Sequence, residues 1–232
     1  MKNYSALVAD IVGSTSLNAK DKVLLENSIQ TLFVDISKVV PNYGRLIKGD
    51  TLEMVVEDPS QGLSIALAIK AFIKTLPIDV TNYDKNKIRA KHFKTHGVRL
   101  AIGYGPLSRY DKGKGIIDGE AIYHAGRAIS NMHTYNKERI VIKNTLFFES
   151  ADKELNVTLR PIFELLDVLL SKATEKQAMV LYLKLLGNTE TEISKLLGID
   201  QSVVNRHSTA VGWNAIETSV GYYSTLFNKD KE

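Results

Sequence analysis

The sequence contains no cysteine among its 232 residues. This absence excludes disulfide bonds, thiol nucleophiles and Cys-ligated zinc or iron–sulfur sites. Long apolar runs are also missing: the first ends at Asp10, and the run from Leu63 to Ile69 ends at Lys70. A membrane span needs about 20 apolar residues, and the N-terminus lacks the pattern of a signal peptide. We therefore expect a cytoplasmic protein with no membrane partner.

Charge is unevenly distributed along the chain. Residues 1–150 carry 21 basic and 15 acidic side chains, whereas residues 151–232 carry 9 and 11. The two parts therefore have net charges of opposite sign, +6 and −2. This difference, and a change in periodicity near residue 150, predict two domains, at 1–150 and 151–232. No linker rich in glycine, serine or proline separates them, so we expect the domains to pack closely.

Hydrophobic periodicity in the first part alternates between strand and helix patterns. This alternation predicts an α+β sandwich of the ferredoxin-like type, with helices on one face of a mostly antiparallel sheet. A polar, lysine-rich segment at 79–94 is expected to be an exposed insertion or an irregular helix. The predicted strands are 6–9, 45–48, 51–56, 98–105 and 138–143, and the predicted helices are 23–40, 63–76 and 121–132. From residue 151 onward only helices are predicted, the first at 155–170.

Two carboxylates stand where this topology brings chain segments together. Asp10 ends the first strand. The predicted strands 45–48 and 51–56 are joined by the tight pair Gly49-Asp50 and should form a hairpin, so Asp50 lies in its turn. A short loop, Gly13-Ser14-Thr15, follows Asp10 and is expected to open a helix. Carboxylate oxygens beside backbone N–H groups at a helix start suit Mg²⁺ and a nucleoside triphosphate. The simpler alternative is that Asp10 caps a helix and Asp50 is an ordinary turn residue.

Four motifs in order give the chain a resemblance to the class III nucleotidyl cyclase catalytic domain. They lie at 9–15 (ADIVGST), 48–50 (KGD), 98–105 (VRLAIGYG) and 119–127 (GEAIYHAGR), so the resemblance covers about residues 4–145. The family resemblance implies a nucleotidyl-cyclase-like sandwich that forms a homodimer and binds Mg²⁺ or Mn²⁺.

The resemblance also implies roles for particular residues. Asp10, Asp50 and the backbone carbonyl of Ile11 would bind the metal, and residues 13–15 would bind phosphate. Arg127 would contact the triphosphate across the dimer, although it could equally form a surface ion pair.

The chain departs from the family pattern at three positions. Tyr123 replaces an Asn that supports the transition state, Ile116 replaces an Asp that contacts the purine, and Leu46 replaces a base-contacting Lys. These departures favour a degenerate nucleotide or metal sensor over a cyclase. Two other features, His92 with His96 and the basic loop at 112–115, are expected to be solvated surface rather than ligand sites.

The region at about 174–212 has the pattern of a helix-turn-helix. A capped helix is followed by a short helix, a glycine and a second helix with polar residues on its N-terminal face. This region resembles sigma-factor region 4 and LuxR-type motifs. The chain as a whole has a weaker resemblance to the SatD-type bacterial proteins, which combine an Asp-Ile and Gly-Asp core with a terminal helical motif. In this arrangement Gln201, Ser202, Asn205 and Arg206 would meet DNA. The negative charge of this part is an objection to DNA binding, and the alternative is a helical module that contacts proteins. We favour DNA binding, because a dimer would present two copies of the motif and the positively charged first part could contribute to phosphate contacts.

Two functions are compatible with these features. In the first, the protein is a DNA-binding transcriptional regulator whose cyclase-like domain dimerises and senses a nucleotide or metal. In the second, it is a two-metal nucleotidyl cyclase whose helical tail is regulatory. The departures from the cyclase pattern favour the first.

Overall fold

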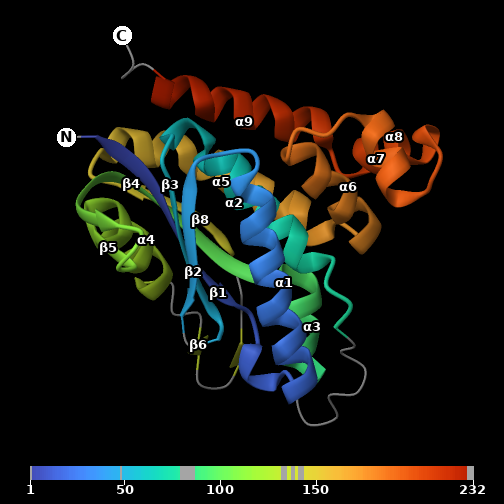
Figure 1. Cartoon of the computed structure of the whole chain (residues 1–232), viewed down its shortest axis with the longest axis horizontal. Helices are drawn as coiled ribbons and strands as arrows, with labels where there is room; N and C mark the ends of the chain where they lie inside the picture. Colours follow the sequence, from blue (N-terminus) through green and yellow to red (C-terminus); the bar gives the residue numbers. More distant parts are fainter. Residues whose placement is uncertain are drawn as a thin grey trace.

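The computed structural model describes residues 2–47, 49–78, 87–131, 135–136, 139–140 and 144–228. Its first part alternates strands and helices, and its tail is helical (Figure 1). The strands are β1 (Asn3–Ile11), β2 (Asn42–Ile47), β3 (Thr51–Val56), β4 (Val98–Asp111), β5 (Ile116–Gly119), β6 (Tyr135–Asn136), β7 (Arg139–Ile140) and β8 (Leu146–Ser150). The helices are α1 (Ala19–Ser37), α2 (Gly62–Lys74), α3 (Lys87–His96), α4 (Glu120–Asn131), α5 (Lys153–Lys172), α6 (Glu175–Leu185), α7 (Glu190–Leu197), α8 (Gln201–Ala210) and α9 (Trp213–Asn228).

The central sheet has the order β2-β3-β1-β4-β5, and all of these pairs are antiparallel. The α+β prediction and the predicted hairpin are therefore confirmed. Three of the described strands, β5, β6 and β8, were not predicted. β5 turns back on the end of β4, and β8 pairs with β4 in parallel. Of the predicted strand at 138–143, only Arg139 and Ile140 lie within the described residues. Of the polar segment at 79–94, only the part from Lys87 onward lies within them.

Helices cover both faces of the sheet, so the prediction that they lie on one face is wrong. Alternate side chains of β1 point to opposite faces. Leu7 and Ala9 pack in one core cluster with α1 and α2, whereas Ala6 and Val8 pack in a second cluster with α4. A Cβ at Gly103 of β4 would lie 2.0 Å from the carbonyl oxygen of Ala121. Small residues on this face therefore let α4 approach the sheet closely.

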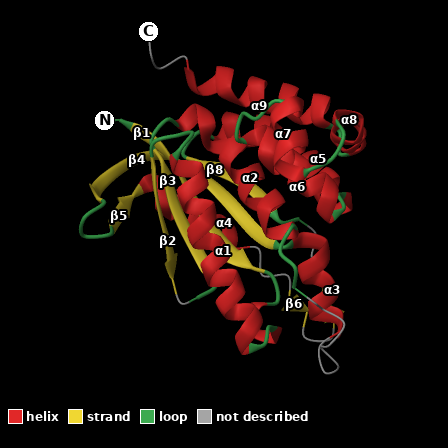
Figure 2. Cartoon of the chain, turned by 45° about the vertical axis from the view of Figure 1, so that its right-hand side comes forward, coloured by secondary structure: helices red, strands yellow, loops and turns green. Residues whose placement is uncertain are grey.

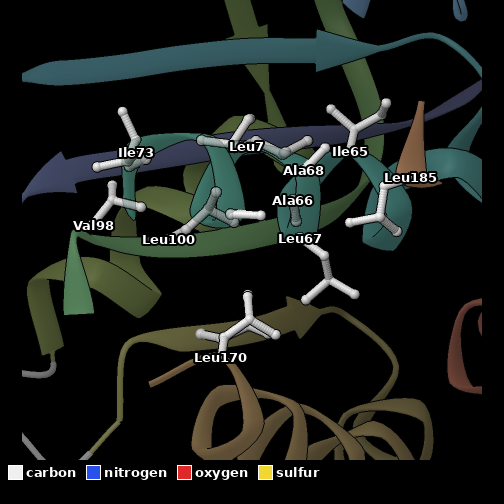
Figure 3. Packing of buried hydrophobic residues seen from close by; sticks show 14 of the residues in the cluster. Leu7, Ile65, Ala66, Leu67, Ala68, Ile73, Val98, Leu100, Leu170 and Leu185 are labelled. Atoms are coloured by element: carbon white, nitrogen blue, oxygen red, sulfur yellow. The ribbon is translucent and has the colours of Figure 1, made fainter. Parts of the chain in front are cut away.

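The tail helices share the main hydrophobic core with the sheet. Figure 3 shows Leu170 of α5 and Leu185 of α6 beside α2 and β4, where they join Leu67 and Leu100. Tyr223 of α9 is fully buried in the same cluster. Figure 2 shows α6 to α9 gathered at one end of the molecule. Within the described residues, no helix is both long and apolar enough to cross a bilayer.

Candidate functional site

The register of β1 and β3 brings the two predicted carboxylates to the same edge of the sheet. Asp10 is the cross-strand partner of Thr51, and Asp50 is the residue directly before Thr51. The backbone N–H of Ile11 donates to the carbonyl oxygen of Asp50 at 3.0 Å. We refer to this pair of carboxylates as the Asp10–Asp50 site. The site lies at the C-terminal end of β1. Side chains alternate between the two faces along a strand, so Asp10 lies on the same face of the sheet as Ala6 and Val8.

Each carboxylate is held by a side chain from a different element. Arg99, paired with Asp10 across β1 and β4, donates from Nε to Oδ1 at 3.0 Å and also bonds Oδ2 through its second nitrogen. The hydroxyl of Ser14 donates to Asp50 Oδ2 at 2.7 Å. The side chains of Asp10 and Arg99 are 26% and 17% exposed. The site is therefore a half-buried ionic cluster open to solvent.

The loop after Asp10 differs from the predicted helix start. Gly13 has a left-handed φ of 72°, and Ser14–Ser16 form a single 3-10 turn. The α-helix begins only at Ala19, where the side chain of Asn18 accepts a hydrogen bond from the backbone N–H of Asp21. Thr15 is exposed on the turn. Asp10 is thus not the cap of α1, and a macrodipole does not act on residues 13–15 as it would at the end of a long helix.

Leu46 and Ile116, two positions at which the chain departs from the cyclase pattern, are placed differently from the two carboxylates. Leu46 packs against the core on the α1 and α2 side, opposite to Asp10. Arg45, one residue earlier, is paired with Glu53, and its Nε donates to Glu53 Oε2 at 2.8 Å. It also donates to the backbone oxygen of Gly115, which ties the β4–β5 turn to β2. Ile116 lies at the start of β5 beside that turn.

The exposed face of α4 carries Tyr123 and Arg127, spaced one turn apart. The Tyr123 hydroxyl donates to Asp118, and this hydrogen bond raises the pKa of Tyr123. Tyr123 is 51% exposed, so it is not part of the core beneath α4. Arg127 points to solvent from the helix that covers the Asp10 face of the sheet. His124 is partly buried.

The donor chemistry of the Asp10–Asp50 site fits a divalent cation. Mg²⁺ is commonly held by one or two carboxylates, with water and substrate phosphates completing its shell. Within the described ranges, no group of three or more His, Asp or Glu side chains could hold a metal without such help. Asp10 and Asp50 would therefore hold the cation together with oxygens of its ligand. Arg99 currently balances the charge of Asp10, so a cation there competes with the guanidinium.

Arg99 is the site residue that sequence reasoning missed. It lies in a predicted strand, inside the cyclase-like segment 98–105, and strand arginines are usually solvated. The usable signal was its position. Arg99 is the second residue of β4 and Asp10 is the last but one of β1, so the antiparallel register of these two strands places the two residues opposite each other.

The two weaker motifs keep a structural role. His92 and His96 stack on α3 with ring centroids 6.1 Å apart. Burial lowers the pKa of His96 to about 4, and its Nδ1 is buried with no hydrogen-bond partner among the described residues. The 112–115 loop is the turn between β4 and β5, where Lys112 forms an ion pair with Glu57 at 2.6 Å.

Helices α6, α7 and α8 enclose a small core of their own. Val180, Ile193 and Val204, one from each helix, are fully buried and in contact. Gly198 ends α7 in the left-handed conformation, with φ at 63°. A short helix, a glycine turn and a second helix therefore stand at the predicted positions.

The four residues predicted to meet DNA are all exposed on α8. The exposed set is Gln201, Ser202, Asn205 and Arg206, and Val204 and Ser208 form the buried side of the helix. Acidic residues lie close by, since Glu190 and Glu192 begin α7 and Asp200 precedes α8. Arg206 is the only residue among the four that could neutralise a phosphate.

No protein-family model matches the chain, and no curated protein matches it. Two solved structures of bacterial light-regulated adenylyl cyclases are similar, with sequence identities of 15% and 16%. Each similarity has a TM-score of 0.41 and covers 63% of this chain, and they cover 74% and 42% of the cyclase chains. A similarity of this size does not establish function.

Proposed function

We propose that the Asp10–Asp50 site binds a nucleoside triphosphate together with Mg²⁺ or Mn²⁺, and that a dimer of the chain converts it as a nucleotidyl cyclase does. The observation that carries this proposal is the convergence of Asp10, Asp50, Arg99 and Ser14 from separate elements at one edge of the sheet. Asp10 and Asp50 would hold the cation, which would stabilise negative charge on the phosphates and lower the pKa of a coordinated hydroxyl.

The remaining steps belong to the protein's own side chains. Ser14 fixes the orientation of the Asp50 carboxylate through its hydrogen bond. If a cation bound Asp10 in place of the guanidinium, Arg99 would be available to donate to phosphate oxygens. Its charge would be poorly screened there, because the cluster is half-buried. Arg127 is exposed on α4 and would contact the triphosphate of a ligand held by a second subunit.

Product analysis by mass spectrometry tests this function. The purified chain is incubated with each of ATP, GTP, CTP and UTP and with Mg²⁺ or Mn²⁺. We expect a cyclic nucleotide product that disappears in Asp10→Asn and Asp50→Asn. The matched control is Asp111→Asn, which should keep the activity, because this carboxylate lies at the far end of β4 and its side chain is 44% exposed. Unchanged triphosphates in every incubation would reject the cyclase activity, and equilibrium dialysis with the same nucleotides would then show whether binding remains.

We infer a second candidate function, DNA binding by the helix-turn-helix region, from the exposure of the predicted contact residues on α8. Selection from a random duplex pool tests it. A specific protein should enrich one sequence, and Arg206→Ala should weaken that complex by about 1–3 kcal/mol. If wild-type protein enriches no sequence at low salt, this function is rejected.

A further inference from the structure

The outer face of α5 carries an apolar stripe with no partner in the described part of the chain. Val157, Leu165 and Val168 are 71%, 67% and 48% exposed, and Pro161 is exposed between them. The spacings of four, four and three residues place all of them along one side of the helix. Three large apolar side chains in one row are uncommon on a free surface and indicate a contact with another molecule.

Charges at the two ends of this stripe are opposite. Glu154 lies in the first turn of α5 and Lys172 in the last turn. Both are exposed, and neither forms an ion pair within the described part of the chain. Glu154 and Lys172 are equally far from Phe163 along the sequence, on either side of it. Pro161 and Leu165 are also equally far from Phe163, but closer to it. The stripe is therefore self-complementary about its midpoint.

We propose that a second copy of this chain docks on this stripe, with the two α5 helices antiparallel about a two-fold axis near Phe163. In that arrangement Glu154 of each subunit faces Lys172 of the other, and Leu165 packs against Pro161 of the other. An isologous contact of this kind pairs each residue with its symmetry mate, as a two-fold dimer requires. Antiparallel helix dipoles add to the attraction.

The contact is a single helix pair, and interfaces below about 1,200 Å² are weak or transient. The dimer should therefore depend on concentration. It differs from the dimer implied by the proposed function, because its contact surface is the outer face of α5, whereas the other would bring Arg127 of α4 to a ligand held by the second subunit.

Sedimentation velocity from low micromolar to several hundred micromolar protein tests the pairing by charge reversal. Glu154→Lys and Lys172→Glu should each weaken dimerisation at least about tenfold, since each creates two like-charge contacts. The double variant, Glu154→Lys with Lys172→Glu, restores opposite charges across the axis and should recover the dimer. Lys176→Glu, an exposed lysine on α6, is the control for net charge and should leave dimerisation unchanged.

Cross-linking gives an independent readout, because the native sequence has no cysteine. Leu165→Cys should form a covalent dimer with a short bis-maleimide reagent, whereas Val39→Cys, after the end of α1, should not. A chain that stays monomeric at every concentration overturns the pairing. So does a dimer that is indifferent to both charge reversals, and that second result would leave the cyclase-type dimer of the proposed function intact.

Discussion

The buried ion pair between Lys70 and Asp167 predicts a large loss of stability on substitution. Lys70 Nζ lies 3.2 Å from Asp167 Oδ1, and the two side chains are 3% and 7% exposed. The carboxylate also accepts hydrogen bonds from the backbone N–H and the hydroxyl of Thr145, at 2.5 and 2.6 Å. Burial opposes ionisation of Asp167, but the ammonium of Lys70 and these hydrogen bonds outweigh it and lower its pKa.

Asp167→Asn keeps the volume and removes the charge. The ammonium of Lys70 then remains buried with neutral acceptors, among them Val98 O, Thr145 O and the Thr145 hydroxyl, and without the negative charge of Asp167. Removing one partner of a buried pair costs about 3–5 kcal/mol. For a chain of this length that loss lowers the melting temperature by roughly 10 °C, at about 2–4 °C per kcal/mol.

Urea unfolding followed by circular dichroism measures this loss. Glu175→Gln is the control, because the Glu175–Lys94 pair is exposed and should contribute less than about 1 kcal/mol. The double variant, Lys70→Met with Asp167→Asn, removes the unpaired charge and should recover part of the stability, as a double-mutant cycle would show. A free energy of unfolding for Asp167→Asn within about 1 kcal/mol of wild type would refute the reasoning.

Three further predictions concern packing and pH. Burial lowers the pKa of His96 from 6.5 to about 4, so the unfolded chain binds more protons than the folded chain between these pH values. The free energy of unfolding should therefore fall by about 2–3 kcal/mol as the pH drops through this window. His96→Gln should reduce this pH dependence in urea unfolding experiments. The groups that face His96 are Asp167, Lys70, Lys74 and His92. Gly103→Ala and Gly126→Ala should differ in sign. The first puts a Cβ against the backbone of α4 and should cost several kcal/mol or prevent soluble expression, whereas the second meets no atom within 4 Å and should raise the melting temperature slightly.

Local signals in the sequence were sufficient to predict the β2–β3 hairpin and the convergence of Asp10 with Asp50. Gly49 and Asp50 mark the turn between two β-rich runs, and a hairpin beside the first strand leaves few alternatives. The side of the sheet that α4 covers could not be predicted, because an amphipathic helix pattern shows which of its faces is buried but not against what. The sequence contains only an indirect signal, which is that Ala6, Ala101 and Gly103 are small. A sheet face lined by small residues lets a helix approach closely.

The ion pairs Arg99–Asp10 and Lys70–Asp167 were harder to predict from the sequence than the strands and helices that carry these residues. The Arg99–Asp10 pair depends on antiparallel register between segments about 90 residues apart, and neither segment fixes that register alone. Lys70 was seen only as the residue that ends an apolar run. Its burial depends on Asp167, which comes from a helix predicted to belong to another domain.

The same buried pair connects the tail helices to the candidate site. Asp167 on α5 holds the ammonium of Lys70, which donates to the carbonyl oxygen of Val98 at 2.9 Å. The next residue is Arg99, whose guanidinium binds Asp10. α5 therefore supports the start of β4, on which the geometry of the Asp10–Asp50 site depends. Because proteins open locally in cooperative units, weakening α5 should loosen Arg99 before the hairpin that carries Asp50. Hydrogen exchange on Asp167→Asn would show it as faster exchange at the start of β4 than in β3.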